Sequence, residues 1–207
     1  MTPEDITAHF TRSDGSYAFA RWGRPIVPVV FGVDDAVLGV IKGAIEAVVT
    51  LANHRMAETD PEFGANLMLF FFAEWDELID LPNLDQLVPE LGPLVARLKA
   101  ADANQYRLFR FDAAGAISAA FVFVRMDAAL AEMPAETLAL AQAAQVMVLW
   151  GEGAFAARSP LAIAPGGAVI LRPEIGDMIR AGYDPVMPVA ASEASHALRL
   201  FARMQQG

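Results

Sequence analysis

The feature that most constrains the fold is an amphipathic segment set between two short apolar runs. Residues 34–53 (DDAVLGVIKGAIEAVVTLAN) place apolar side chains at the period of an α-helix, and Asp34 is a suitable N-cap. The flanking runs IVPVVFG (26–32) and ANLMLFFFA (65–73) are short and apolar, which is typical of strands. Strand, helix and strand in this order predict a parallel crossover unit. Pro28 cannot donate a ladder hydrogen bond, so the first strand is expected at an edge or a bulge.

A hairpin and several helices complete the predicted elements. Residues 105–112 (QYRLFRFD) and 116–125 (AISAAFVFVR) flank a turn that ends in Gly115, which favours a β-hairpin. The second arm is apolar on both faces and belongs in the interior, whereas the first carries Arg107 and Arg110 and belongs nearer an edge. The other expected elements are a first helix capped by Thr2, helical stretches at 73–80 and 84–101 (the second broken by Pro89 and Pro93), a long helix over 135–151, a strand at 168–171, a short helix at 173–181 and a final helix from Ser192.

These elements predict a single α+β domain over residues 1–207. We expect a mixed sheet of about four or five strands with helices packed on it. Residues 156–207 form a possible helical C-terminal extension. A chain of this size buries roughly 70% of its unfolded surface, so it needs no disulfide or metal for stability. The absence of cysteine also excludes thiolate nucleophiles and cysteine metal sites.

Charge and hydropathy limit the expected partners. The net charge of −10 repels phosphate backbones and no basic stripe offsets it, so nucleic acid is not an expected partner. The hydrophobic content of 55% is high for a soluble monomer, yet the longest uncharged run, 137–151, is too short and too polar to span a membrane. We therefore expect no transmembrane segment and an apolar patch that pairs with a second copy, giving a homo-oligomer such as a dimer. The segment MTPEDITAHF does not resemble a signal peptide, which favours a cytoplasmic location.

Histidines and acidic residues are the first candidates for chemistry. His9 and His196 share helix faces with polar residues, so both are expected to be solvated. His54 lies four residues before Glu58, a spacing at which an imidazole and a carboxylate on a helix can share a metal. The alternative is a histidine that interacts favourably with the end of the preceding helix. The segment EWDELID (74–80) either gathers a hard cation or turns its acids to water while Trp75, Leu78 and Ile79 are buried. We favour the second alternative for both segments.

Two glutamines stand out in the long helix. Gln142 and Gln145 are three residues apart, so their side chains project together. Buried amides need hydrogen-bond partners, whereas peripheral ones mark a wet stripe, and we favour a hydrogen-bonded or wet role over a ligand pocket. No dinucleotide, phosphate-loop or nucleophile-elbow pattern is present, so neither a cofactor nor a catalytic set is predicted.

Several segments resemble an uncharacterised family of alphaproteobacterial proteins that is thought to be distantly zincin-like. They are ARWGRPI (20–26), the helix that runs to LANH (34–54), GANLMLFFF (64–72) and the late helix with Gln-x-x-Gln. The order of elements is also similar to the N-terminal half of zincin-like metallopeptidase domains. The resemblance implies that AQAAQ (141–145) occupies the place of the H-E-x-x-H zinc motif.

The chemistry of that motif does not carry over to this chain. Ala141 has no ligand atom, the amide of Gln142 is essentially non-basic and cannot act as a general base, and Gln145 is a poor zinc ligand. We therefore expect no metal and no peptidase activity. The leading hypothesis is a non-catalytic domain on a degenerate hydrolase-like scaffold that self-associates or binds another protein. The alternative is a small-molecule-binding protein or hydrolase with a polar pocket at the end of the sheet, formed by His54, Glu58, Gln142 and Gln145.

Overall fold

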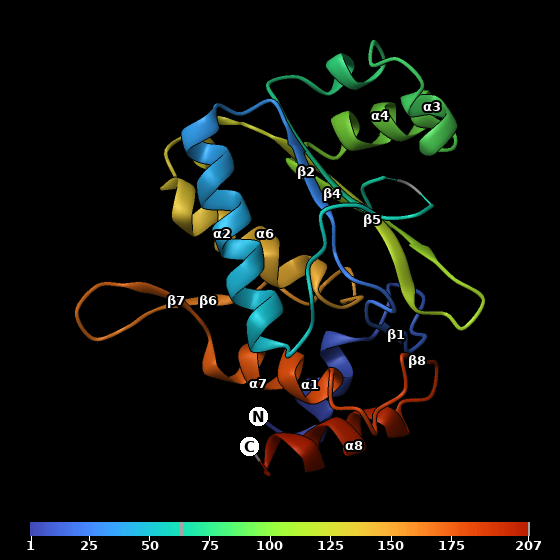
Figure 1. Cartoon of the computed structure of the whole chain (residues 1–207), viewed down its shortest axis with the longest axis vertical. Helices are drawn as coiled ribbons and strands as arrows, with labels where there is room; N and C mark the ends of the chain where they lie inside the picture. Colours follow the sequence, from blue (N-terminus) through green and yellow to red (C-terminus); the bar gives the residue numbers. More distant parts are fainter. Residues whose placement is uncertain (63, 207) are drawn as a thin grey trace.

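The protein is an α+β fold built on a four-stranded mixed sheet (Figure 1). The structure is a computed structural model and describes residues 1–62 and 64–206. The strand order is β2-β3-β5-β4, with β2 parallel to β3, β3 parallel to β5, and β4 antiparallel to β5. The strands are β2 (Pro28–Phe31), β3 (Leu67–Phe72), β4 (Gln105–Phe111) and β5 (Ile117–Arg125). The predicted mixed sheet is therefore confirmed.

The predicted crossover is present and joins β2 to β3 through α2 (Asp35–Leu51). The side chain of Asp34 caps this helix by accepting a hydrogen bond from the amide of Val37 (2.8 Å). Gly32 turns the chain out of β2 with a φ of 83°, and a Cβ at this position would overlap the carbonyl oxygen of Phe71. β2 lies at the edge of the sheet, as the proline at its start predicts.

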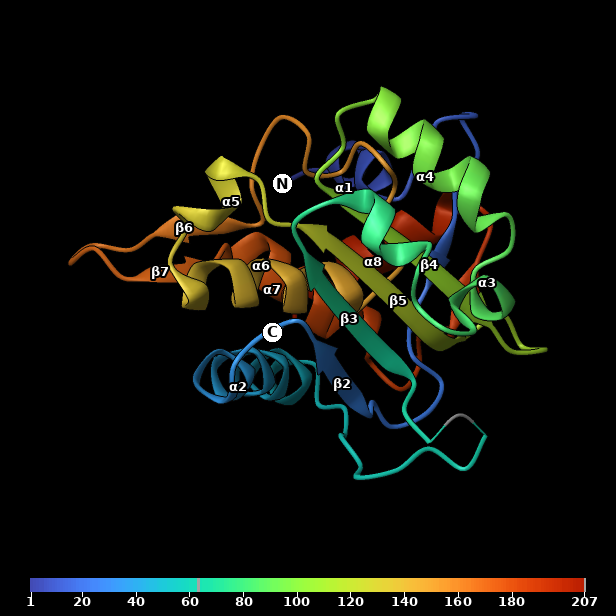
Figure 2. The same cartoon turned by 90° about the horizontal axis from the view of Figure 1, so that it is seen from above.

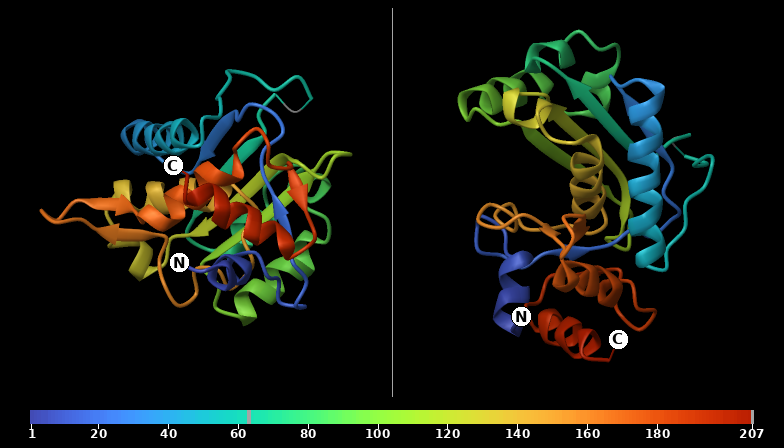
Figure 3. Two further views of the ribbon diagram at one scale, coloured as in Figure 1. Left: turned by 90° about the horizontal axis from the view of Figure 1, so that it is seen from below. Right: turned by 90° about the vertical axis from the view of Figure 1, so that its left-hand side faces the viewer.

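One face of the sheet is covered by α2 and by α6 (Ala135–Val146), which pack against each other (Figure 2). The short helix α5 (Ala128–Ala131) leads into α6. Beyond these lie α1 (Pro3–His9), α7 (Pro173–Gly182) and α8 (Ser195–Met204), grouped together in Figure 3. β1 (Phe19–Ala20) pairs with β8 (Ala190–Ala191). Apolar side chains of α7 and α8 belong to the same hydrophobic cluster as those of α1 and α2, so residues 156–207 pack against the rest of the chain.

The opposite face of the sheet carries a second, smaller hydrophobic cluster. It is covered by the 3₁₀ turn η1 (Trp75–Leu78) and by α3 (Leu84–Leu87) and α4 (Leu91–Ala100). The predicted break at Pro89 is confirmed, because this residue lies between α3 and α4, whereas the predicted break at Pro93 is wrong: Pro93 lies in the first turn of α4, where a proline is tolerated. The prediction of a buried Ile79 is wrong: its side chain is 52% exposed, because the turn is too short to bring it back to the sheet.

α6 ends at Val146, earlier than the predicted end at residue 151. Two indoles satisfy its last carbonyl groups: that of the distant Trp22 donates to Val146 O (2.8 Å), and that of the nearby Trp150 donates to Ala144 O (3.1 Å). The hydroxyl of Tyr183 donates to the carbonyl of the next residue, 147 (2.6 Å). The chain then extends and pairs with residues 20 and 21, which a local helical pattern does not reveal.

A two-stranded hairpin, which we call the β6–β7 arm (residues 161–171), projects from the molecule in Figure 1. It consists of β6 (Leu161–Ile163) and β7 (Val169–Leu171), and β7 confirms the strand predicted at 168–171. The final helix begins at Ser195 rather than near Ser192, without a side-chain cap. Among the described residues, no helix has both the length and the apolar character needed to cross a membrane.

Candidate binding pocket at the edge of the sheet

The buried amide of Gln142 links α6 to the edge strand β4. Gln142 is 1% exposed, and its Oε1 accepts a hydrogen bond from Nη2 of Arg107 (2.6 Å). Its Nε2 donates to Oε1 of Gln105 (3.0 Å), which also accepts from Nη2 of Arg107 (2.8 Å). The alternation of a strand turns Gln105 and Arg107 to the same face, and α6 supplies the facing amide. The hydrogen-bonded alternative therefore holds for Gln142.

Arg107 is a half-buried cation held by neutral groups. None of the ion pairs among the described residues involves it, and its Nε is fully enclosed without a hydrogen-bond partner. Burial lowers the pKa of its guanidinium to about 10, which still leaves it charged at neutral pH. A desolvated cation without a counter-ion is unfavourable, so this site favours the arrival of an anion.

A cavity of about 660 Å³ opens beside Arg107. This volume lies within the roughly 300–1,000 Å³ range of small-molecule sites. Nη1 of Arg107 makes no hydrogen bond to a described residue, and unlike Nε it is not fully enclosed. It is therefore the guanidinium atom available to a ligand. The cavity is lined by one run of β4, by Gln145 at the end of α6, and by the segment that follows: residues 104–109, Phe111, Gln145, residues 149–152, Phe155, Ala156 and Arg12.

The wall opposite β4 is aromatic and fixed by stacking. The ring of Trp150 stacks on Phe10 with centroids 5.2 Å apart and planes at 8°, and Phe155 meets Trp150 edge-on at 5.0 Å. His9 also packs edge-on against Trp150 and Phe155, so it is half-buried and the prediction of a solvated His9 is wrong. The wall therefore offers a rigid apolar surface close to the charged group.

The charges around the cavity favour an anion. Arg107 and Arg12 are the cations among its lining residues, and Glu152 is the carboxylate. Glu152 is already engaged, since one of its oxygens accepts from the amide of Ser13 (2.9 Å) and the other lies 3.6 Å from Nε of Arg12. The lining residues thus carry a net positive charge, whereas the whole chain has a net charge of −10.

Gln145 is the second predicted residue at this pocket. It lies one turn after Gln142 and lines the cavity, half-buried, with its Nε2 donating to Ala141 O (3.1 Å). Its Oε1 makes no hydrogen bond to a described residue. The amide of Gln145 is therefore positioned to contact a ligand, whereas that of Gln142 holds Arg107 in place.

His54 and Glu58 lie apart from the glutamines. Nε2 of His54 is 2.9 Å from Arg24 O, and its ring packs on Tyr183 with centroids 5.1 Å apart. Burial lowers the pKa of His54. Glu58 is exposed, and neither residue lines the cavity beside Arg107. The structure thus brings together two of the four candidate residues and leaves the other two elsewhere.

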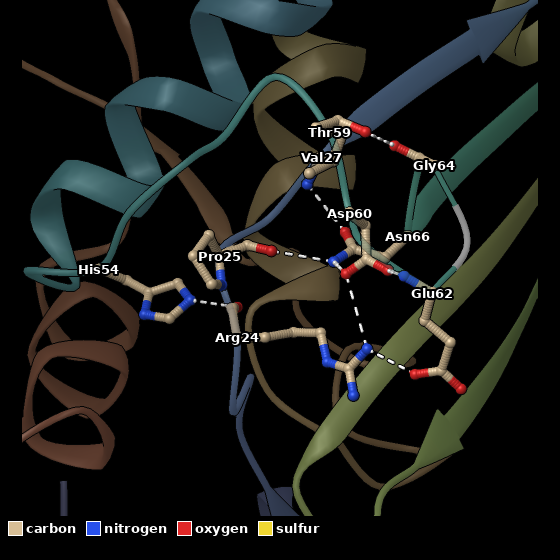
Figure 4. Close-up of polar contacts among 9 residues, drawn as sticks. All are labelled: Arg24, Pro25, Val27, His54, Thr59, Asp60, Glu62, Gly64 and Asn66. Carbon is tan, nitrogen blue, oxygen red and sulfur yellow. Dashed lines mark hydrogen bonds and ion pairs between the residues drawn. The ribbon is translucent and has the colours of Figure 1, made fainter.

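A buried polar cluster lies near His54 (Figure 4). Asn66 accepts from the amide of Val27 (2.8 Å) and donates both to Pro25 O (2.9 Å) and to Oδ2 of Asp60 (3.0 Å). Arg24 lies 3.6 Å from the same oxygen of Asp60. These contacts pin the entrance of β2 to the start of β3, which is a structural role.

The acidic candidates are on the surface. In the segment 74–80, Asp76 pairs with Lys99 (2.6 Å), and Glu77 accepts from the amides of Ala73 and Glu74 (3.0 and 2.7 Å). Within residues 1–62 and 64–206, no group of three or more metal-ligating side chains is arranged to hold an ion. These acids therefore stabilise the turn η1 and its contact with α4.

Sequence reasoning missed the residues that define the pocket, above all Arg107, Gln105 and Trp150. The signal for Arg107 was present, because alternation along β4 puts it on the same face as Phe109, which packs into the larger core. Trp150 was hidden by the overlong helix prediction.

Comparisons with protein-family models, with curated proteins and with solved structures found no match to this chain. The resemblance to a zincin-like family accordingly stays a prediction. The pocket must be interpreted from its own geometry.

Proposed function

We propose that the protein binds an organic anion in the pocket beside β4 and acts by binding rather than by catalysis. The observation that carries this proposal is the guanidinium of Arg107, which lines the cavity, is largely desolvated, and is held by two neutral amides through Nη2 while Nη1 makes no hydrogen bond to a described residue. A carboxylate or phosphate there supplies the missing counter-charge. The aromatic wall of Trp150 and Phe155 suits a ligand with an apolar body.

The residues around the cavity support binding more than reaction. Its lining contains no histidine, serine, threonine or lysine, and its carboxylate, Glu152, already bonds to Ser13 and pairs with Arg12. Its phenol, Tyr106, belongs to the cluster on the opposite face of the sheet, where the ring lies 6.4 Å from that of Phe123. General acid–base or nucleophilic chemistry needs such a group within hydrogen-bond reach of the substrate. The proposal therefore assigns Arg107 to anchoring the anion and Gln145 to orienting it.

Two probes that differ by one charge test this assignment. We expect 3-phenylpropionate to bind at least about tenfold more tightly than 3-phenylpropionamide, because a charge-assisted hydrogen bond contributes about 1.5–3 kcal/mol. Ligand-observed NMR titration or calorimetry measures both affinities. The preference for the acid should vanish in Arg107→Met and persist in Arg97→Met, whose arginine is exposed on α4.

A second variant, which keeps Arg107, tests the proposal independently of whether Arg107→Met folds. Gln145→Glu keeps the size of the side chain and adds a negative charge at the lining of the cavity, so it should weaken the acid and leave the amide nearly unchanged. Equal binding of the acid and the amide to the wild-type protein, or an unchanged preference in both pocket variants, contradicts the proposal.

Self-association is a second candidate function, favoured by the β6–β7 arm. The arm exposes Ile163 (77%), Val169 (39%) and Ile170 (38%), and an isolated two-stranded hairpin is marginally stable in water. Residues 157–172 carry two arginines and no acidic residue, whereas the whole chain has a net charge of −10. The apolar surface of the arm and the two arginines that flank it, Arg158 and Arg172, thus suit the acidic surface of a second copy.

Light scattering after size-exclusion chromatography tests the role of the arm. We expect the wild-type protein to be a dimer, and the double variant Ile163→Ser/Ile170→Ser to be a monomer, because it removes the apolar contact. Leu198→Ser changes an apolar residue on α8 that is 59% exposed and should leave the dimer intact. A monomeric wild-type protein at about 100 µM would rule out this role, since specific dimers commonly bind more tightly than that.

A further inference from the structure

β4 presents unpaired peptide groups at the edge of the sheet. The amide of Arg125 donates to Asn104 O (2.8 Å), so these two residues form a hydrogen-bonded pair of the β4–β5 ladder. Successive pairs of an antiparallel ladder alternate between hydrogen-bonded and non-hydrogen-bonded. The alternation turns the peptide N–H and C=O groups of three residues away from β5: Gln105, Arg107 and Phe109.

The two edges of the sheet differ in how they are protected. β2 has four residues and begins with Pro28, which removes a donor and discourages the addition of a strand. β4 has seven residues, Gln105–Phe111, and contains neither proline nor lysine. No backbone group of the described residues outside the sheet hydrogen-bonds to the three outward peptide groups of β4. This edge is therefore suited to accept another extended chain.

The cavity follows the same edge. Residues 104–109 form one of its walls without interruption, and residues 149–152 with Phe155 form the other. An extended chain rises about 3.4 Å per residue, so a five-residue segment spans roughly the same length as Gln105–Phe109. A volume of about 660 Å³ accommodates the backbone and inward side chains of such a segment.

We propose that the ligand is an extended peptide segment of a partner protein, which adds antiparallel to β4 with an acidic residue opposite Arg107 and apolar residues two positions away. This inference rests on the proposed function and names the class of anion. Opposite charges that face each other across an antiparallel pair attract, and residues two positions away lie on the same face of the sheet. On that face Phe109 and the aromatic wall meet the apolar side chains. The backbone supplies affinity and the carboxylate supplies selectivity.

Three blocked pentapeptides separate the backbone contribution from the charge. The probe is acetyl-Val-Thr-Glu-Thr-Val-amide, whose glutamate is central and whose valines lie two positions away on either side. The first control replaces glutamate with glutamine, and the second carries an N-methyl group on the glutamate, which removes the donor to Arg107 O. We expect each change to weaken binding at least about tenfold. Arg107→Met should remove the preference for glutamate over glutamine but keep the effect of N-methylation.

Amide hydrogen exchange reports where the peptide binds. Saturating peptide should slow the exchange of the Arg107 amide at least about tenfold, since that N–H gains an acceptor. The amides of Tyr106 and Leu108, which already face β5, serve as internal controls and should change little. If the outward amides are already protected from exchange without peptide, and this protection increases with protein concentration, a second copy covers β4. That result overturns the inference.

The peptide inference can be refuted separately from the proposed function. If 3-phenylpropionate binds in an Arg107-dependent manner and the pentapeptide does not compete with it, the site takes small anions and the peptide inference is wrong. If neither probe binds, the proposed function itself is wrong. Equal affinity for the N-methylated and unmethylated peptides also overturns strand addition, because the backbone then contributes nothing.

Discussion

Replacing Asn66 with alanine is expected to lower the free energy of unfolding by about 3–4 kcal/mol. Asn66 is 0% exposed and makes three side-chain hydrogen bonds, to Val27 N, Pro25 O and Oδ2 of Asp60. Truncation leaves the buried amide of Val27 and the carbonyl of the half-buried Pro25 without these partners, and it removes a donor from the carboxylate of Asp60, a residue that is 4% exposed. Each unsatisfied buried group costs about 1–3 kcal/mol.

Chemical denaturation with urea, at constant pH, measures this change. Asn104→Ala is a matched control, because the half-buried Asn104 side chain makes one hydrogen bond, to Asp127 (2.7 Å), and its loss should cost about 1 kcal/mol. A similar loss of stability in both variants would show that the cluster of Asn66 and Asp60 is far less important than its burial indicates.

Lowering the pH from 7 to 4 is expected to destabilise the protein by about 2–3 kcal/mol through His196 alone. The side chain is 3% exposed, and the prediction of a solvated His196 is wrong. Nδ1 lies 2.8 Å from the hydroxyl of Tyr17, while Nε2 is enclosed without a partner. An imidazolium would need acceptors for both N–H groups, so burial, with a smaller effect of the Arg199 charge, lowers the pKa of His196 to about 4.

The direction of the pH effect follows from the two pKa values. The unfolded chain binds a proton near pH 6.5, whereas the folded protein resists protonation until the pH approaches 4. Stability from the neutral, buried ring is therefore complete above about pH 6.5 and is lost as the pH falls toward 4. Urea titrations across this window should show the loss in the wild-type protein and a smaller one in His196→Gln. Tyr17→Phe keeps the buried imidazole and should keep the pH dependence; a wild-type and a His196→Gln profile of equal slope would contradict the assignment.

Local patterns predict the parts of this fold that depend on neighbouring residues. The stripe of 34–53 predicts α2, the apolar runs beside it predict β2 and β3, and Pro28 predicts the edge position of β2. These features depend on periodicity and on the chemistry of single residues, both of which a sequence displays directly.

The errors arise where distant segments decide the outcome. His196 follows a polar helical stripe, but Tyr17, 179 positions away, supplies a partner and the ring of Phe19 packs against the imidazole. α6 ends early, where Trp22 donates to Val146 O and Tyr183 donates to Met147 O just beyond the helix. The periodicity of a segment does not indicate partners from elsewhere in the chain. The predictions of a solvated His196 and of a helix that ends at residue 151 therefore followed the local pattern alone.

The candidate site was predictable in part. The pairing of Gln142 with Gln145 identified the helix that borders the pocket, and the alternation of β4 placed Arg107 on a strand near an edge. The 35-residue separation between Arg107 and Gln142 concealed that the two share a hydrogen bond. His54 and Glu58 were grouped with the glutamines by residue type, and the fold holds them on another part of the surface.

A crystal structure of the protein soaked with 3-phenylpropionate tests the central claim most directly. We expect a carboxylate oxygen about 2.7–2.9 Å from the guanidinium of Arg107, the phenyl ring against Trp150 and Phe155, and the Gln142–Arg107 hydrogen bond unchanged. Ligand density away from this cavity, or a carboxylate that turns to solvent while Arg107 keeps only its two amide partners, would contradict the account.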